Sequence, residues 1–123
     1  MSGSNQVLEE LQRAVEGLTY PSESDEPLDV FSWDGKGKAL EQVAAHAGKD
    51  RKIEEVQAET FFSQLDDSDD SGRYRQLQRL LTSSLEPFTI ARVGAGEVRV
   101  DIYLIGKLAT GEWVGLHTVS VET

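Results

Sequence analysis

The sequence contains no cysteine among its 123 residues. Disulfide bonds, thiol catalysis and zinc sites built on thiolates are therefore excluded. It also lacks a run of 18 apolar residues, which argues against a membrane-spanning helix. Its first ten residues, MSGSNQVLEE, show neither the basic start nor the apolar stretch of a signal peptide. We therefore expect a single domain, residues 1–123, in the reducing cytoplasm, with no membrane partner.

Basic side chains are scarce. Twelve Lys and Arg stand against 22 Asp and Glu, which leaves a formal net charge of −10. The acid is concentrated in the first 72 residues, which hold 17 acidic and 6 basic side chains. Such a charge argues against nucleic acid as a partner. Two interpretations stay open, a solvated acidic surface or a surface that faces the basic, phosphate-binding cleft of another protein.

Four segments have apolar residues at helical spacing. This spacing predicts helices over residues 4–18, 38–47 and 58–65, and another from Tyr74 to Leu85 that Pro87 ends. Residues 20–27 contain two prolines among alternating serines and acids, which predicts neither helix nor strand. Residues 66–72 have no apolar side chain and are predicted to form an exposed loop.

The remaining segments read as strands, and the last third of the chain is rich in them. Strands are predicted over residues 28–33, 52–56, 88–93, 98–107 and 112–122. Gly94-Ala-Gly96 and Ala109-Thr-Gly111 are suited to tight hairpin turns between the last three. These three strands should form an antiparallel meander after the helices, so the expected class is α+β.

Residues 67–78 partly imitate a calcium-binding loop. Asp67, Asp69 and Ser71 occupy the first ligand positions, and Gly72 occupies the position of the sharp turn. Arg75 and Gln78 stand where the later ligands should be, so the closing glutamate is missing. We expect a solvated acidic loop, and a calcium-responsive module is the least favoured alternative.

The sequence shows no catalytic motif. His46 and His117 have no partners at the spacing of a metal site or a general base, so we expect structural roles for both. Gly94-x-Gly96 lacks a third glycine and leads into a strand, which favours a turn over a dinucleotide site. We therefore expect no enzyme, no cofactor and no metal site of the protein's own.

Two acidic segments could contact a partner. One is the loop between Pro21 and Pro27, because flanking prolines lower the entropic cost of presenting its side chains. The other is the end of the sequence, Val119–Thr123, where Glu122 and Thr123 offer hard oxygen ligands of the kind that Mg²⁺ prefers. From the residues alone, ordinary surface is the more common interpretation of both segments.

A series of short stretches carries a resemblance to a known family. They include Gly17-Leu18, Ser22-Glu-Ser24, Pro27, Val30-Phe31, Trp33, Phe61-Phe-Ser63, Leu80-Leu81, Val100-Asp-Ile-Tyr-Leu-Ile-Gly106, Gly111, Gly115 and Val121-Glu-Thr123. No single stretch is specific, but their order over residues 7–123 resembles the nuclease A inhibitor family.

The resemblance implies a fold and a function. The fold would be a three-layer α-β-α sandwich with a mainly antiparallel sheet, similar to plant pathogenesis-related proteins. The function would be inhibition of a Mg-dependent, sugar-nonspecific DNA/RNA endonuclease by a cytoplasmic protein, monomeric when free and binding 1:1. Glu23 and Thr123 would approach the metal in the nuclease active site, and the expected contact set is completed by Ser22, Ser24, Asp25 and Glu122. The alternative is a noncatalytic protein-binding module of the same fold with an unrelated partner.

Overall fold

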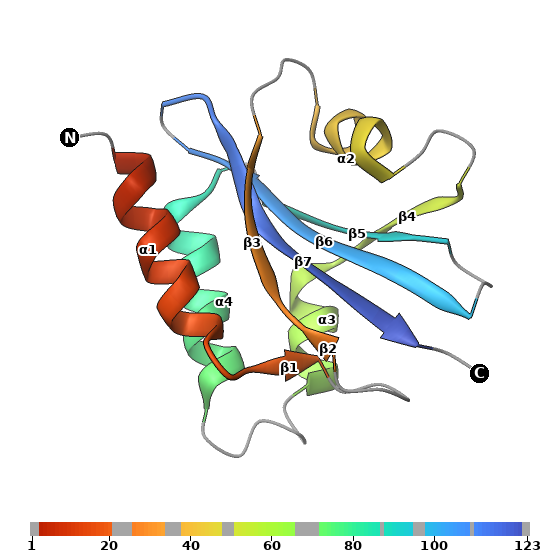
Figure 1. Ribbon diagram of the computed structural model, residues 1–123, viewed down its shortest axis with the longest axis horizontal. Helices are drawn as coiled ribbons and strands as arrows, with labels where there is room; N and C mark the ends of the chain where they lie inside the picture. The colour runs from red at the N-terminus through yellow and green to blue at the C-terminus, as the bar shows by residue number, and fades with distance from the viewer. Residues whose placement is uncertain are drawn as a thin grey trace.

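A five-stranded antiparallel sheet lies at the centre of the described part of the chain in the computed structural model (Figure 1). The structure describes residues 3–20, 26–33, 38–47, 51–65, 72–86, 88–94, 98–108 and 110–121. The strands of this sheet run in the order β3-β7-β6-β5-β4. They are β3 (Asp29–Trp33), β4 (Ile53–Val56), β5 (Phe88–Val93), β6 (Arg99–Lys107) and β7 (Trp113–Val121).

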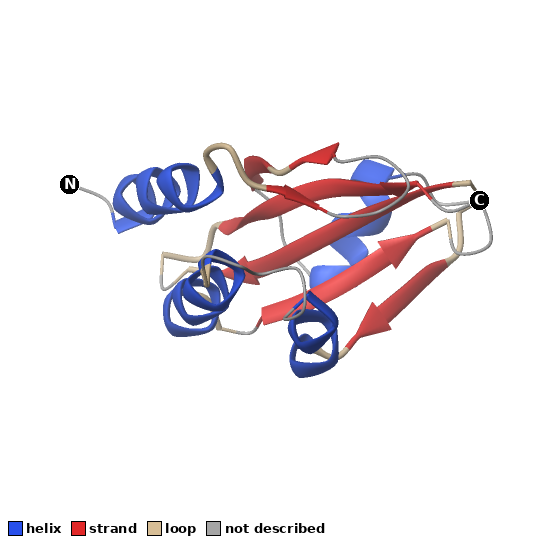
Figure 2. Cartoon of the chain, turned by 90° about the horizontal axis from the view of Figure 1, so that it is seen from below, coloured by secondary structure: helices blue, strands red, loops and turns tan. Residues whose placement is uncertain are grey.

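Helices pack against both faces of this sheet (Figures 1 and 2). They are α1 (Gly3–Val15), α2 (Ala39–Ala47), α3 (Ala58–Leu65) and α4 (Arg73–Ser84). The predicted α+β class and the mainly antiparallel sheet are confirmed. The last three strands form the predicted meander, with β6 paired to both β5 and β7. None of the helices in the described residues is long and apolar enough to cross a membrane.

The larger core lies between the sheet and the helices α1, α3 and α4. Because side chains alternate along a strand, Ile102 and Leu104 of β6 both face these helices. They meet Leu11 of α1 and the α4 residues Leu77 and Leu81, whose side chains are all completely buried. The helical spacing of these leucines in the sequence is thus explained by one shared buried face.

The smaller core lies on the opposite face, under α2. Val43 of this helix packs against Tyr103 and Ile105, the alternate residues of β6, and against Trp113 of β7. A nine-residue helix covers only part of the sheet. Polar side chains therefore occupy the same face of the sheet beyond it, and they form part of the region described next.

The segment of residues 20–27 differs from the prediction. Thr19–Tyr20 forms β1 and Glu26–Pro27 forms β2, and these short strands pair antiparallel, with Thr19 opposite Pro27 and Tyr20 opposite Glu26. Strands of two residues are too short to show a period of alternation, so they could not be predicted from the hydrophobic pattern. The largest boundary difference is in α1, which ends at Val15 rather than residue 18. The other boundaries agree with the prediction to within one residue, and β6 begins at Arg99 rather than at the exposed Val98.

Candidate functional site

The six residues expected to contact a nuclease lie outside the described residues: Ser22, Glu23, Ser24, Asp25, Glu122 and Thr123. The structure does describe the residues that flank them. Tyr20 and Glu26 stand on either side of the acidic loop, and Val121 is the last residue of β7. The position of these flanking residues shows how the fold supports each segment.

The base of the acidic loop is the β1–β2 pair, and side chains from two helices hold it. The hydroxyl of Tyr74, in the first turn of α4, donates a hydrogen bond to the carbonyl oxygen of Thr19. The ring of Tyr20 stacks on Phe61 of α3, with 5.8 Å between centroids and 10° between planes. The loop therefore starts and ends on backbone that is fixed to the helical layer.

The same pair of strands reaches β7. Asp29 lies opposite His117 in the antiparallel pairing of β3 and β7. Because the two strands run in opposite directions, the residues that precede Asp29, back to Glu26, lie toward the end of β7 at Val121. The Thr118 hydroxyl, 1% exposed, donates a hydrogen bond of 3.0 Å to the carbonyl oxygen of Pro27. We call this end of the sheet, where β7 finishes, the Val121 end, and the opposite end, where β7 starts, the Trp113 end. The described residues next to both acidic segments therefore lie at the Val121 end of the sheet.

A cluster of charged side chains stands on the α2 face near this end. Asp101 of β6 accepts a hydrogen bond of 2.5 Å from Arg51, and its other oxygen lies 2.8 Å from Nε2 of His117 on β7. Arg51 also donates to the carbonyl oxygens of Val93 and Arg99, both at 3.3 Å. Arg99 is the strand partner of Val121, so this cluster fastens the backbone beside the last residues of β7.

The electrostatics of the cluster follow from its half-buried position. Burial by itself raises the pKa of the Asp101 carboxyl, but the hydrogen bonds from Arg51 and His117 outweigh burial and hold that pKa below its ordinary value. Burial also raises the pKa of the Tyr103 hydroxyl, and the Asp101 carboxylate adds to this effect. Both oxygens of Asp101 are engaged, so the group is suited to cross-linking strands.

Both histidines make side-chain contacts within the fold. His117 pairs with Asp101, and the ring of His46 stacks on Trp33 with 3.7 Å between centroids and 7° between planes. Sequence reasoning did not find Arg51 as a partner of Asp101. The alternation of Arg99, Asp101 and Tyr103 along β6 was a signal for one polar face, but Arg51 is fifty residues away in sequence from Asp101.

The calcium-like segment is only partly described. Asp67, Asp69 and Ser71 lie outside the described residues. Helix α3 precedes the segment, and α4 begins within it at Arg73, so that Arg75 lies exposed within α4. Among the described residues, no group of three or more His, Cys, Asp or Glu side chains could hold a metal ion.

The fold and these contacts define an acidic α+β protein that holds the bases of two acidic segments side by side at one end of an antiparallel sheet. Residues 5–123 match the family described as nuclease A inhibitor-like protein, and the chain belongs to that family. A comparison with curated proteins gives no match. Membership supports a nuclease-inhibitor role with a nuclease as partner, and it suggests a protein that is not itself catalytic.

Proposed function

We propose that this protein inhibits a Mg-dependent, sugar-nonspecific DNA/RNA endonuclease by occupying its active site with the acidic loop and the last residues of the sequence. Family membership over residues 5–123 is the observation that carries the proposal. Inhibition would be 1:1, by a cytoplasmic protein that is monomeric when free and has no catalytic role.

Glu23 and Thr123 are the residues that we propose to enter the active site. The Glu23 carboxylate would lie near the metal ion that the nuclease holds, and the oxygens of Thr123 would occupy the position of a substrate phosphate. Their neighbours Ser22, Ser24, Asp25 and Glu122 would contact the rim of the cleft. Carboxylate and hydroxyl oxygens are the ligands that Mg²⁺ accepts, which suits these residue types to that position.

The geometry around the two segments supports their acting together. The Thr118–Pro27 hydrogen bond links the strand that follows the acidic loop to the strand that ends at Val121. Tyr74 and Arg51 fix the backbone on the two sides of this link. Preorganised backbone lowers the entropy lost when a partner orders the segments, which favours tight binding.

The charge of the chain supports the same partner. A net charge of −10 is complementary to a cleft that evolved to bind the phosphates of DNA and RNA. Charge complementarity acts mainly on partner choice and on the rate of association. The protein would thus compete with nucleic acid for a basic surface.

The test is an inhibition assay against a panel of purified Mg-dependent nonspecific endonucleases. We expect stoichiometric inhibition of at least one of them. Glu23→Gln and deletion of Thr123 should each weaken that inhibition roughly 30- to several-thousand-fold, because losing one member of a buried charged contact costs ~2–5 kcal/mol. Glu86→Gln is the matched control. Glu86 is exposed, and its backbone N–H bonds Lys107 at the Trp113 end of the sheet, far from both segments.

Three outcomes are informative. Inhibition that is lost in the two site variants and kept in Glu86→Gln supports the proposal. Inhibition that survives both site changes rejects Glu23 and Thr123 as the blocking residues while leaving the inhibitor role in place. No inhibition of any nuclease in the panel favours the alternative, a noncatalytic binding module with another partner.

A further inference from the structure

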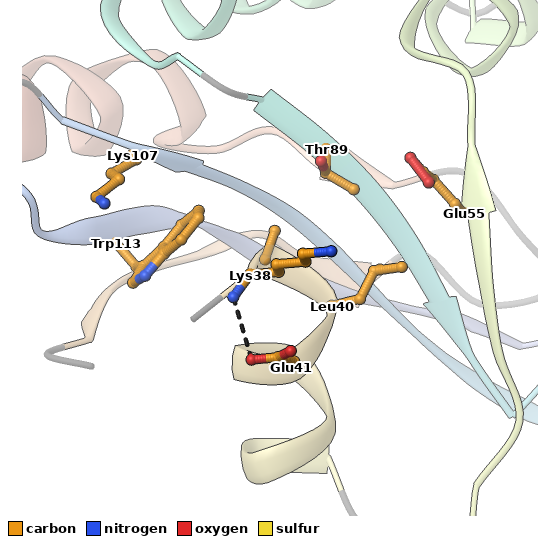
Figure 3. Close-up of a pocket in the computed structure, with 8 residues that line it drawn as sticks. Lys38, Leu40, Glu41, Glu55, Thr89, Lys107 and Trp113 are labelled. Atoms are coloured by element: carbon orange, nitrogen blue, oxygen red, sulfur yellow. Dashed lines mark hydrogen bonds between the residues drawn. The ribbon is translucent and has the colours of Figure 1, made fainter. Parts of the chain in front are cut away.

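A cavity opens at the Trp113 end of the sheet, between the first turn of α2 and the strands beneath it. Its volume is about 390 Å³, within the range of sites that bind small molecules. Figure 3 shows the side chains around it. The lining residues are Lys38, Ala39, Leu40, Glu41, Glu55, Thr89, Lys107 and Trp113.

The walls of the cavity are largely apolar. Trp113 begins β7, is 2% exposed and packs in the smaller core with Ala39 and Leu40 of α2. The buried Trp113 and the aliphatic side chains of Ala39 and Leu40 together give the cavity an apolar wall. The size and polarity of the site therefore suit a small organic molecule better than a metal ion or free phosphate.

One polar atom in the wall of the cavity is buried without a hydrogen-bond partner. Nε1 of Trp113 is shielded from water and has no hydrogen-bond partner. An indole N–H can only donate, and a buried donor without an acceptor is destabilising. Lys107 lies beside it, with Nζ 5.7 Å from the centroid of the Trp113 ring. This side of the cavity therefore offers a donor and a cation to an acidic group on a ligand.

The acidic residues of the lining do not cancel this arrangement. The Glu41 carboxylate accepts a hydrogen bond of 3.2 Å from the backbone N–H of Lys38, so it is engaged at the start of α2. Glu55 comes from β4, and Figure 3 shows it on the opposite side of the cavity from Lys107 and Trp113. Glu55 is thus separated from Lys107 across the site, whereas Lys38 and Glu41 lie next to each other at the start of α2.

We propose that this cavity binds a small organic carboxylate. The carboxylate would face Lys107 and the indole N–H of Trp113, and the apolar body would lie against Ala39 and Leu40. Because Nε1 of Trp113 is shielded from water, its contact with the carboxylate requires lining side chains to move, and the Lys107 side chain has four rotatable bonds.

The site is separate from the proposed nuclease contact. Trp113 and Val121 are the two ends of β7, eight residues apart, which corresponds to roughly 26 Å along an extended strand. Ligand binding and nuclease inhibition should therefore occur independently. If ligand binding fails the test, the proposal of nuclease inhibition is unaffected, and the reverse is also true.

The test uses 2-naphthoate as the probe and the two tryptophan indole N–H signals of a ¹H–¹⁵N spectrum as the readout. Trp113 should shift on titration while Trp33, the other tryptophan, moves less. Lys107→Gln should weaken binding roughly tenfold or more, because it removes a charge-assisted contact. Lys52→Gln is the control, since Lys52 is exposed and its amino group lies 3.5 Å from Glu54 outside the cavity. Trp113→Phe keeps an aromatic wall and tests the loss of the N–H.

The neutral analogue 2-naphthalenemethanol separates recognition of the carboxylate from recognition of the ring. Weaker binding of this alcohol, together with loss of affinity in Lys107→Gln, supports the proposal. Equal binding of alcohol and carboxylate, or unchanged affinity in Lys107→Gln, rejects the assigned chemistry. No shift of the Trp113 signal at millimolar naphthoate rejects the site.

Discussion

The hydroxyl of Thr118 donates a hydrogen bond to the carbonyl oxygen of Pro27 and so joins β7 to β2 across 91 residues of sequence. Thr118 stands three residues before Val121, and Pro27 follows the acidic loop by two residues. One buried side chain thus links the bases of the two segments that we propose to enter a nuclease. This hydrogen bond is a local contact, so its loss should destabilise the β1–β2 pair before the rest of the fold.

Thr118→Val should loosen this link while keeping the size and shape of the side chain. We expect a loss of about 1 kcal/mol in the free energy of unfolding, the usual contribution of one hydrogen bond. Hydrogen exchange at the backbone amide of Tyr20 should become faster because the β1–β2 pair opens more often. Thr82 is exposed on α4, and Thr82→Val removes hydrogen bonds within that helix, so exchange at Tyr20 should stay unchanged. Equal exchange in both variants would contradict the link.

Asp101→Asn should destabilise the protein in a pH-dependent way. The folded pKa of Asp101 is lowered, so its stabilising effect is complete above the unfolded value, about 3.9, and is lost as pH falls through the folded value. At neutral pH we expect a loss of about 2 kcal/mol from the weakened contacts with Arg51 and His117. The difference between variant and wild type should shrink below about pH 4.

Urea unfolding at a series of pH values measures this difference. Glu54→Gln is the matched control, because Glu54 is exposed and its ion pair with Lys52 should contribute less than about 0.5 kcal/mol. A loss in Asp101→Asn that is the same at low and neutral pH would show that the carboxylate charge is not what matters there.

Gly115→Ala should be strongly destabilising. A Cβ atom at Gly115 would lie 1.9 Å from the carbonyl oxygen of Leu104 on the neighbouring strand, and this backbone atom cannot move without disturbing β6. We expect a cost of about 3 kcal/mol or more. Gly111→Ala is the comparison, because nothing lies within 4 Å there and only its φ of +97° is unfavourable. Thermal unfolding should rank Gly115→Ala as the less stable, and the reverse order would rule out the close approach of β6 and β7.

The rate at which the protein binds its nuclease should fall as salt rises. A net charge of −10 should speed the approach to a basic cleft, and exposed charges are screened beyond ~8 Å at physiological ionic strength. Stopped-flow measurements from low to high salt should show a decrease of roughly tenfold or more in the association rate constant, with a smaller change in dissociation. A rate that stays flat would exclude the acidic surface as the docking surface.

The class of the fold and most of its elements follow from the sequence alone. Helical spacing of leucines predicted α4 because one face of that helix is fully buried, as Leu77 and Leu81 show. Alternation along residues 98–107 predicted β6 because its two faces meet different layers. These patterns are local consequences of burial, so they are visible without knowing what a segment packs against.

Which residues meet one another depends on the tertiary structure. The pairing of Arg51 with Asp101 and the bond from Thr118 to Pro27 join groups that are far apart in the chain. The packing around Trp113 leaves its buried indole N–H without a partner. Such contacts depend on strand order and register, and neither leaves a period in the sequence. The need for glycine at position 115 also becomes visible only in the folded protein, because a side chain there would meet the backbone of Leu104.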